Sequence, residues 1–251
     1  ERLYANAEEY LQQQHQWDCI YIDPDRRPGG NRITGNAAAY SPDVISLYQK
    51  HGPKAKRWLI KLSPMTDISW FERQMQCHVK TLVFSYKGEV KELLVEAGNH
   101  KHSETVIVEV NEQTFNLYNQ QTDLQIEASP KTIFCELSAA AIKAGFRPYI
   151  IEQSGLTPIN KNSFYLTGNA IIPYALGRCF VLEYTFSGSL GEIEKQIQHL
   201  SINKANISAR DFVLSAEETR KKLRLEDGGD VYLFFTGKEK TKYCFVAKKP
   251  D

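Results

Sequence analysis

An apolar stretch that ends in charged residues stands out near the start of the chain. Residues 17–22 read WDCIYI, and Asp23-Pro24-Asp25-Arg26-Arg27 follows directly. The short run, rich in β-branched residues, is typical of a buried strand, and Pro24 fixes the direction in which the chain leaves it. Ligands of open α/β sheets bind at the carboxyl ends of strands. Two carboxylates and two guanidiniums therefore lie where a site is expected, although Asp-Pro is also a common start of a solvated turn.

A second buried strand is predicted over residues 58–62, and Lys61, Ser63 and Pro64 lie at its carboxyl end. Helices are predicted before, between and after the two strands, over residues 5–14, 43–52 and 67–76. Asp67 is a suitable N-cap for the third helix. Alternating helices and strands are typical of a parallel sheet covered by helices. We therefore expect the two strands to end side by side.

The later part of the chain divides into shorter segments. Strands joined by turns, which we expect to close the first sheet, are predicted over 78–86, 89–95 and 105–110, with a turn at Lys87-Gly88. A small unit follows, with helices over 137–145 and 149–154 and a strand over 160–166. The last unit is predicted to hold helices over 189–199 and 215–223 and strands over 179–185, 230–236 and 243–248. A strand or loop is predicted over 205–207 and a turn at 227–229.

Composition excludes several classes of protein. Hydrophobic residues make up 42% of the chain, which excludes a disordered or fibrous protein. No stretch approaches the roughly 18 apolar residues that span a bilayer, so we expect no membrane partner. A net charge of +1 means that any basic surface is local. The chain shows no signal peptide and no initiator Met, so we expect a fragment of a longer cytoplasmic protein.

Cysteine and histidine spacing gives little evidence of metal binding. The five cysteines are widely separated and form no CxxC pair, so neither a disulfide framework nor a zinc cluster is expected. His100 and His102 can share one face of a strand. They lack the further ligands that a zinc site requires, and we expect no metal.

The strand-end motif resembles a known family. Asp23-Pro24 is similar to the fourth motif of class I S-adenosylmethionine-dependent methyltransferases, Asp/Asn-Pro-Pro-Tyr/Phe, with Asp25 in place of the second proline. Asn6-Ala7 resembles the segment that follows the third strand of those enzymes, and residues 58–64 resemble their fifth strand. With the tail segments KANISAR (204–210) and KKLRLEDGGD (221–230), the chain resembles a bacterial methyltransferase family that carries ferredoxin-like and THUMP-like domains.

This resemblance implies an α/β fold. Residues 1–126 would be the C-terminal half of a Rossmann-like methyltransferase sheet, and two small α+β domains would follow, ferredoxin-like over 127–176 and THUMP-like over 177–251. The sequence contains no GxG, the pattern with which such enzymes hold S-adenosylmethionine after their first strand. We therefore expect the cofactor-binding half to be missing and this chain alone to be inactive, with S-adenosylmethionine bound by the full-length protein.

The resemblance also implies roles for residues. Asp23, Pro24 and Asp25 would form the catalytic mouth. Substrate would contact Arg26, Arg27, Lys61, Ser63 and Pro64, and the cofactor would contact Asn6, Ala7 and Asp23. Methyl transfer depends mainly on alignment of the reacting groups and needs no nucleophilic side chain.

The tail carries a local excess of positive charge. Between residues 204 and 224 six basic residues face three acidic ones, a local charge of 6 − 3 = +3. The resemblance implies RNA, either tRNA or rRNA, bound by Lys204, Asn206, Arg210, Lys221, Lys222 and Arg224. The last three lie near a predicted helix C-terminus, where cations are also favoured without any partner. The alternative function is a non-catalytic RNA-binding or scaffolding protein with a degenerate methyltransferase shell.

Overall fold

A computed structural model describes residues 5–13, 15–25, 40–109, 114–118, 126, 130–237 and 241–250. The chain forms two compact units. Unit 1 comprises Glu1–Gln120 and Ala139–Phe146, and unit 2 comprises Gln121–Ser138 and Arg147–Asp251. These units are defined by packing contacts and do not test the three domains expected from the sequence. The domain boundaries at 126/127 and 176/177 stay predictions. No helix in the described ranges is both long enough and apolar enough to cross a membrane.

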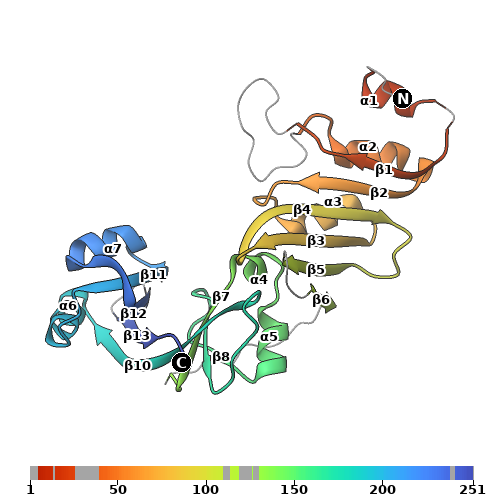
Figure 1. Ribbon diagram of the computed structural model, residues 1–251. Helices are drawn as coiled ribbons and strands as arrows, with labels where there is room; N and C mark the ends of the chain where they lie inside the picture. Colours follow the sequence, from red (N-terminus) through yellow and green to blue (C-terminus); the bar gives the residue numbers. More distant parts are fainter. Residues whose placement is uncertain are drawn as a thin grey trace. The chain divides into compact units, whose positions relative to one another are not determined.

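Unit 1 is built on a mixed six-stranded sheet with the order β1-β2-β4-β3-β5-β6 (Figure 1). Its strands are β1 (Trp17–Ile22), β2 (Ala55–Leu62), β3 (Val79–Tyr86), β4 (Glu89–Gly98), β5 (Glu104–Glu109) and β6 (Thr114–Tyr118). Its helices are α1 (Ala7–Leu11), α2 (Val44–His51), the 3-10 helix Gly52–Lys54, α3 (Ile68–Met75) and α4 (Ala139–Lys143). β1 and β2 are parallel, and β4 runs antiparallel to both of its neighbours.

Local sequence explains most elements of unit 1. Asp67 accepts a hydrogen bond from the Trp70 amide at 2.8 Å, so its predicted role as the N-cap of α3 is confirmed. Lys87 and Gly88 both have positive φ, the conformation that a tight hairpin between β3 and β4 requires. α2 and α3 cover the sheet face on which Trp58 and Thr81 lie, since Tyr48 packs edge-on against Trp58 and Thr81 bonds to α3.

Unit 2 contains a mixed seven-stranded sheet with the order β11-β12-β13-β10-β7-β9-β8. Its strands are β7 (Ile133–Leu137), β8 (Thr157–Pro158), β9 (Tyr165–Gly168), β10 (Gly177–Gly188), β11 (Lys204–Phe212), β12 (Glu226–Gly237) and β13 (Lys242–Lys248). Its helices are α5 (Arg147–Ser154), α6 (Leu190–His199) and α7 (Ala216–Leu223). β10 joins the segment before residue 176 to the segment after it, so both share one sheet. The ferredoxin-like assignment of 127–176 stays a prediction.

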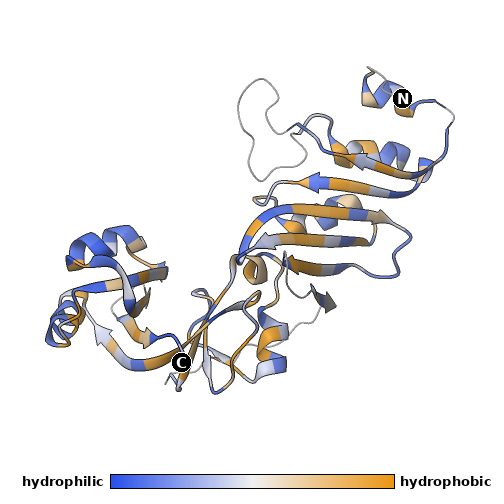
Figure 2. Cartoon of the chain, viewed as in Figure 1, coloured by the Kyte–Doolittle hydropathy of each residue, from blue (hydrophilic) through white to orange (hydrophobic). Residues whose placement is uncertain are grey.

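Apolar residues cover both faces of this second sheet. One face packs α6 and α7 over Ala205, Leu233 and Phe235. The other face encloses an aromatic cluster of Phe134, Tyr165, Phe180, Phe234 and Phe245. Figure 2 shows that α7 is largely hydrophilic, whereas the strands of unit 2 carry hydrophobic segments between polar ones. Each of α6 and α7 begins with a complete capping box, which supplies partners for amides that a helix start leaves unpaired.

Two predictions for unit 2 were wrong. The strand predicted over 160–166 is found at Tyr165–Gly168, because the Asn160 side chain accepts bonds from the Asn162 and Ser163 amides and forms a turn. The turn predicted over 227–229 is an irregular part of β12, where Gly228 and Gly229 have positive φ and the register with β11 shifts. Glycines occur both in turns and in irregular strands, so the composition of this segment could not distinguish the two.

Cysteine pairing also differs from expectation. Cys135 and Cys179 form a disulfide between β7 and β10, although no disulfide framework was expected. The two residues are separated by 44 positions in sequence and are directly paired in the antiparallel register. Spacing along the chain carried no sign of this contact. The expected cytoplasmic location stays a prediction.

Two glycine-to-alanine substitutions should change the stability of unit 2 in opposite directions. A methyl group at Gly177 would lie 2.6 Å from the Glu136 carbonyl oxygen, whereas Gly191 in α6 has open space around it. We expect Gly177→Ala to lower the free energy of unfolding by about 1–3 kcal/mol through overpacking. Gly191→Ala should raise it by up to about 1 kcal/mol through helix propensity.

Urea unfolding followed by circular dichroism measures this difference. All three tryptophans, Trp17, Trp58 and Trp70, lie in unit 1, so tryptophan fluorescence records the unfolding of that unit. Equal shifts for both variants would show that the close contact at Gly177 does not determine its effect.

Candidate functional site

The carboxyl ends of β1 and β2 bring two predicted site residues into contact. Ile22 pairs with Ile60 in the parallel register, so the residues that follow them are neighbours. Lys61 Nζ lies 2.9 Å from Asp23 Oδ2, and the Glu92 carboxylate is 3.7 Å from the same nitrogen. The hydrogen bond from Lys61 to Asp23 raises the pKa of the Lys61 amine, against the lowering effect of burial. The result is a half-exposed ion pair at the sheet edge.

Backbone pairing holds the chain after Asp23 in place. Pro24 is buried, and Asp25 exchanges two backbone hydrogen bonds with Ser41, of 2.8 and 3.0 Å. This fixes the exit from β1 near the turn that leads into α2. Arg26 and Arg27, predicted to contact substrate, lie outside the described residues.

Ser63 and Pro64 form a turn after β2. The Ser63 hydroxyl oxygen accepts the Met65 amide at 3.2 Å, and its carbonyl accepts the Thr66 amide at 3.0 Å. The Ser63 side chain is buried, whereas Met65 is 63% exposed. The turn therefore presents Met65 to solvent, and its hydroxyl is engaged in local structure. A substrate contact by Ser63 or Pro64 stays a prediction.

Asn6 and Ala7 lie at the start of α1. Asn6 Oδ1 accepts the Glu8 amide at 2.8 Å and so caps the helix. This arrangement explains the local sequence, since asparagine is a preferred N-cap. The predicted cofactor contact would have to use the remaining amide hydrogens of Asn6 or share its capping oxygen.

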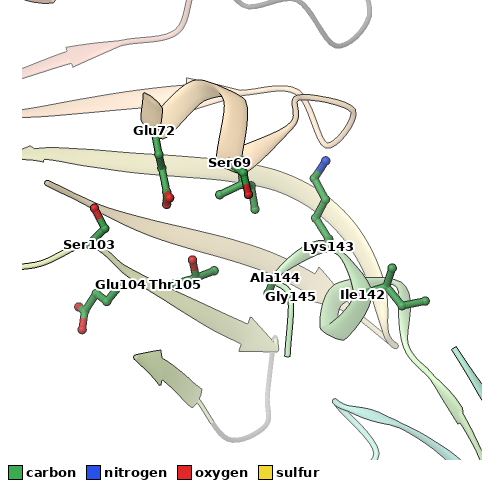
Figure 3. A pocket seen from close by; sticks show the side chains of 10 residues that line it. Ser69, Glu72, Ser103, Glu104, Thr105, Ile142, Lys143, Ala144 and Gly145 are labelled. Atoms are coloured by element: carbon green, nitrogen blue, oxygen red, sulfur yellow. The ribbon is translucent and has the colours of Figure 1, made fainter. Parts of the chain in front are cut away.

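A separate polar pocket of about 270 Å³ lies within unit 1 (Figure 3). Ser69 and Glu72 from α3, Thr105 from β5 and Lys143 from α4 line it. Burial raises the pKa of Glu72, in part offset by a hydrogen bond from Thr81. Burial also lowers the pKa of Lys143. Both shifts disfavour the charged form of the side chain, as burial of an ionisable group does. Sequence reasoning missed this pocket, because only the fold brings these distant segments together.

The predicted RNA-binding residues divide into two groups. Asn206 and Arg210 are engaged within unit 2. Asn206 Nδ2 donates to the Gly229 carbonyl at 2.7 Å, and Arg210 Nε lies 3.1 Å from Glu136. The other group comprises the exposed residues Lys204, Lys221, Lys222 and Arg224. The tail therefore presents fewer available cations than its composition indicates.

A buried carboxylate connects the strands of unit 2. Glu136 on β7 is only 5% exposed and contacts Arg178 at 2.6 Å and Arg210 at 3.1 Å. Ser208 donates to it at 2.6 Å and also bonds to the Tyr165 hydroxyl at 2.8 Å. Burial raises the pKa of Tyr165. Sequence reasoning missed Glu136, whose neighbours in sequence are apolar and carry no motif.

No metal site is indicated in the part of the chain that the structure describes. It contains no group of three or more His, Cys, Asp or Glu side chains arranged to hold a metal ion. His100 and His102 lie in the connection between β4 and β5.

Comparisons with known proteins give two matches. Residues 177–249 match a family model described as THUMP domain-like, which confirms the THUMP-like expectation for this part of the chain. The fold is similar to the crystal structure of a "putative methyltransferase" from Porphyromonas gingivalis W83, with a TM-score of 0.79 and 29% identity. The match covers 93% of this chain and 60% of that chain, so this chain spans about 60% of its length. No curated protein matches this chain.

Removing the Asp23 charge should lower the pKa of Lys61. The Asp23 hydrogen bond is the largest cause of the raised pKa, and the charge of Glu92 acts more weakly. We therefore expect Asp23→Asn to return the Lys61 pKa toward its ordinary range and Glu92→Gln to lower it less. Titration of the Lys61 side chain by NMR measures both. A larger fall for Glu92→Gln would mean that Glu92 is the principal partner of Lys61.

Proposed function

We propose that the full-length protein is an S-adenosylmethionine-dependent methyltransferase that acts on RNA. One observation carries the proposal: nearly the whole chain superimposes on the Porphyromonas gingivalis protein at 29% identity. In this proposal unit 1 contains the C-terminal half of a Rossmann-like catalytic sheet. The ferredoxin-like and THUMP-like segments follow it, as in the bacterial family that the sequence resembles.

The topology of unit 1 supports this assignment. β1 and β2 run parallel through the connecting helix α2, and their carboxyl ends lie together. Such edges are where open α/β sheets bind ligands. The reversed strand β4 then lies between β2 and β3. This agrees with the expectation that antiparallel strands close the sheet.

Roles follow from position at this edge. Asp23 and Pro24 lie at the strand end, with Asp25 next to them, and we assign these three to the catalytic mouth. Lys61 forms an ion pair with Asp23 from the neighbouring strand. Arg26, Arg27, Lys61, Ser63 and Pro64 are proposed to contact substrate. The chemistry required of them is to hold the acceptor atom in line with the methyl group.

The described residues fit S-adenosylmethionine only in part. The strand-end carboxylate suits the region near the sulfonium charge, and Asn6 and Ala7 are proposed to contact the cofactor. Asn6 Oδ1 is already engaged as a helix cap, and no glycine of the sequence stands in a GxG. Groups outside this chain would have to hold the rest of the cofactor, so we derive no step through it.

RNA is the proposed substrate class because of the THUMP-like match over residues 177–249. Lys221, Lys222 and Arg224 lie at the carboxyl end of α7, and the exposed Lys204 begins β11. Such side chains suit phosphate contacts, which position a nucleic acid without reading its sequence. We propose tRNA or rRNA as the partner, and we keep the cytoplasm as the proposed location.

A second candidate function is supported by two observations. The chain lacks the glycine-rich turn, and Asn6 is engaged in capping. A non-catalytic RNA-binding or scaffolding protein with a degenerate methyltransferase shell has these properties. Assays of methyl transfer and RNA binding by the same protein separate the two functions.

Methyl transfer by the full-length protein should depend on Asp23. We expect Asp23→Asn to reduce the transfer of a labelled methyl group from S-adenosylmethionine to RNA by at least about 10²-fold, by analogy with the loss of other charge-stabilising groups. Asp18→Asn is the matched control, because Asp18 is 87% exposed at the opposite end of β1. It should leave turnover unchanged.

Three results separate the alternatives. No transfer by the wild-type protein, together with intact RNA binding, supports the scaffold. Equal losses for the Asp23 and Asp18 variants remove Asp23 from the catalytic mouth. A loss of helical circular dichroism in Asp23→Asn alone assigns Asp23 a structural role.

Salt dependence should reveal the contribution of the α7 cations to RNA binding. Replacing Lys221, Lys222 and Arg224 with Gln should flatten the slope of log affinity against log salt by at most about 2–3, since each phosphate contact contributes roughly 0.7–0.9. Stability should change little, because exposed ion pairs such as Lys221–Glu217 contribute little. Titration of a structured RNA at several salt concentrations measures the slope.

The control variant replaces three exposed lysines of unit 1, Lys50, Lys87 and Lys91, with Gln. This variant should keep the wild-type slope. Equal slopes for the wild type and the α7 variant would mean that Lys221, Lys222 and Arg224 do not contact RNA and only stabilise the end of the helix.

A further inference from the structure

A second pocket lies in unit 2, beside the irregular part of β12. Its volume is about 220 Å³, room for about seven waters at roughly 30 Å³ each. That size suits one planar ring system better than a longer ligand. Its polar and aromatic lining comes from β10, β11, α7 and β12, through Arg178, Asn206, Ser208, Arg220, Asp227 and Tyr232.

The charges of this pocket are already balanced. Arg178 Nη2 lies 2.6 Å from the Glu136 carboxylate. Arg220 contacts Asp227 at 2.5 Å and Glu217 at 2.9 Å. A free anion would have to compete with these carboxylates and would meet the negative charge of Asp227. The pocket is therefore poorly suited to an isolated phosphate, in spite of its two arginines.

The pocket keeps both hydrogen-bond acceptors and hydrogen-bond donors for a ligand. The two Asn206 amide hydrogens go to the Gly229 and Val231 carbonyls, at 2.7 and 3.3 Å, so the Asn206 oxygen is left as an acceptor. Asp227 is 73% exposed and can only accept. Arg178 has five N–H donors and is 52% exposed. Arg220 Nε is buried without a hydrogen-bond partner among the described residues.

An aromatic wall completes the pocket. The ring of Tyr232 lies 4.7 Å from that of Phe180 and 6.4 Å from that of Phe234, so its position is fixed by packing. Lys249 Nζ is 5.9 Å from the Tyr232 ring centroid. Unpaired bases stack on aromatic rings that are held in place, while the edges of the bases form hydrogen bonds with side chains.

We propose that this pocket binds a single unpaired nucleobase through the Tyr232 ring, the Arg178 donors and the Asn206 and Asp227 acceptors. A neutral, flat heterocycle with donors and acceptors on its edge matches the balanced charge, the mixed bonding groups and the size of the cavity. The proposal deepens the proposed function, on which it rests for RNA as the source of the base. The same chemistry would also admit a free nucleotide, and the experiment distinguishes these sources.

The test uses the 251-residue chain labelled with ¹⁵N and titrated with the four nucleoside 5′-monophosphates, ribose 5-phosphate, inorganic phosphate and a single-stranded RNA pentamer. We expect the side-chain signals of Asn206 and Arg178 to move with at least one nucleotide below about 10 mM, a weak single-base affinity. Ribose 5-phosphate and phosphate should have no effect. Tighter binding of the pentamer identifies RNA as the source, and equal binding identifies a free nucleotide.

Variants connect the signal to the pocket. Tyr232→Leu should weaken nucleotide binding at least about fivefold, whereas Tyr232→Phe, which keeps the ring, should retain it. Tyr243→Leu is the matched control, since Tyr243 is an exposed tyrosine of β13 outside the pocket. It should bind as the wild type does.

Two results would overturn the proposal. One is equal binding of ribose 5-phosphate and the nucleotides, which would define an anion site. The other is no response to any nucleotide while Tyr232→Phe and the wild type remain folded. RNA binding with the expected salt dependence, in the absence of nucleotide binding, would overturn the pocket and leave the proposed function standing.

Discussion

Parallel pairing is the constraint from which both candidate sites arise. Parallel neighbours cannot be joined by a tight turn and need a crossover, usually a helix. Unit 1 meets this need with α2 between β1 and β2, and unit 2 meets it with α7 between β11 and β12. The first crossover aligns two strand ends and so brings Asp23 to Lys61. The second places Arg220 of α7 beside Asp227 of β12, where the nucleobase pocket forms.

Electrostatics in unit 2 depends on one buried carboxylate. Burying a charge is costly unless ion pairs and hydrogen bonds compensate it. Glu136 meets this condition with Arg178, Arg210 and Ser208. Removing both arginines would leave the buried carboxylate without a counter-charge, which costs more than an ion pair itself contributes. The network therefore ties β7, β10 and β11 together, and it orients Arg178 at the edge of the pocket.

Sequence reasoning succeeded where chemistry is local. The β1 and β2 strands, the Asp67 cap and the Lys87-Gly88 turn each follow from neighbouring residues, and the shared edge of β1 and β2 follows from their alternation with helices. It failed where the fold brings distant positions together. The Cys135–Cys179 disulfide depends on the register between strands that are remote in sequence. The Glu136 network joins three strands. The nucleobase pocket depends on the irregular part of β12, which Asn206 holds through a hydrogen bond to the Gly229 carbonyl. None of these leaves a periodic or spaced signal in the sequence.

Ion pairing also changes how the tail can recognise RNA. The sequence count gives a charge of +3 between residues 204 and 224, yet Arg210 is paired with Glu136 and Arg220 with Asp227, two carboxylates outside this range that lower the local charge to 3 − 2 = +1. Lys221 also lies 3.5 Å from Glu217. Long-range attraction of phosphates is therefore weaker than the composition indicates, because the carboxylates of Glu136 and Asp227 offset two of the positive charges. Under the proposed function, discrimination between RNAs would then depend on short-range contacts. Those contacts require a fixed aromatic surface with donors and acceptors, which the wall around Tyr232 provides.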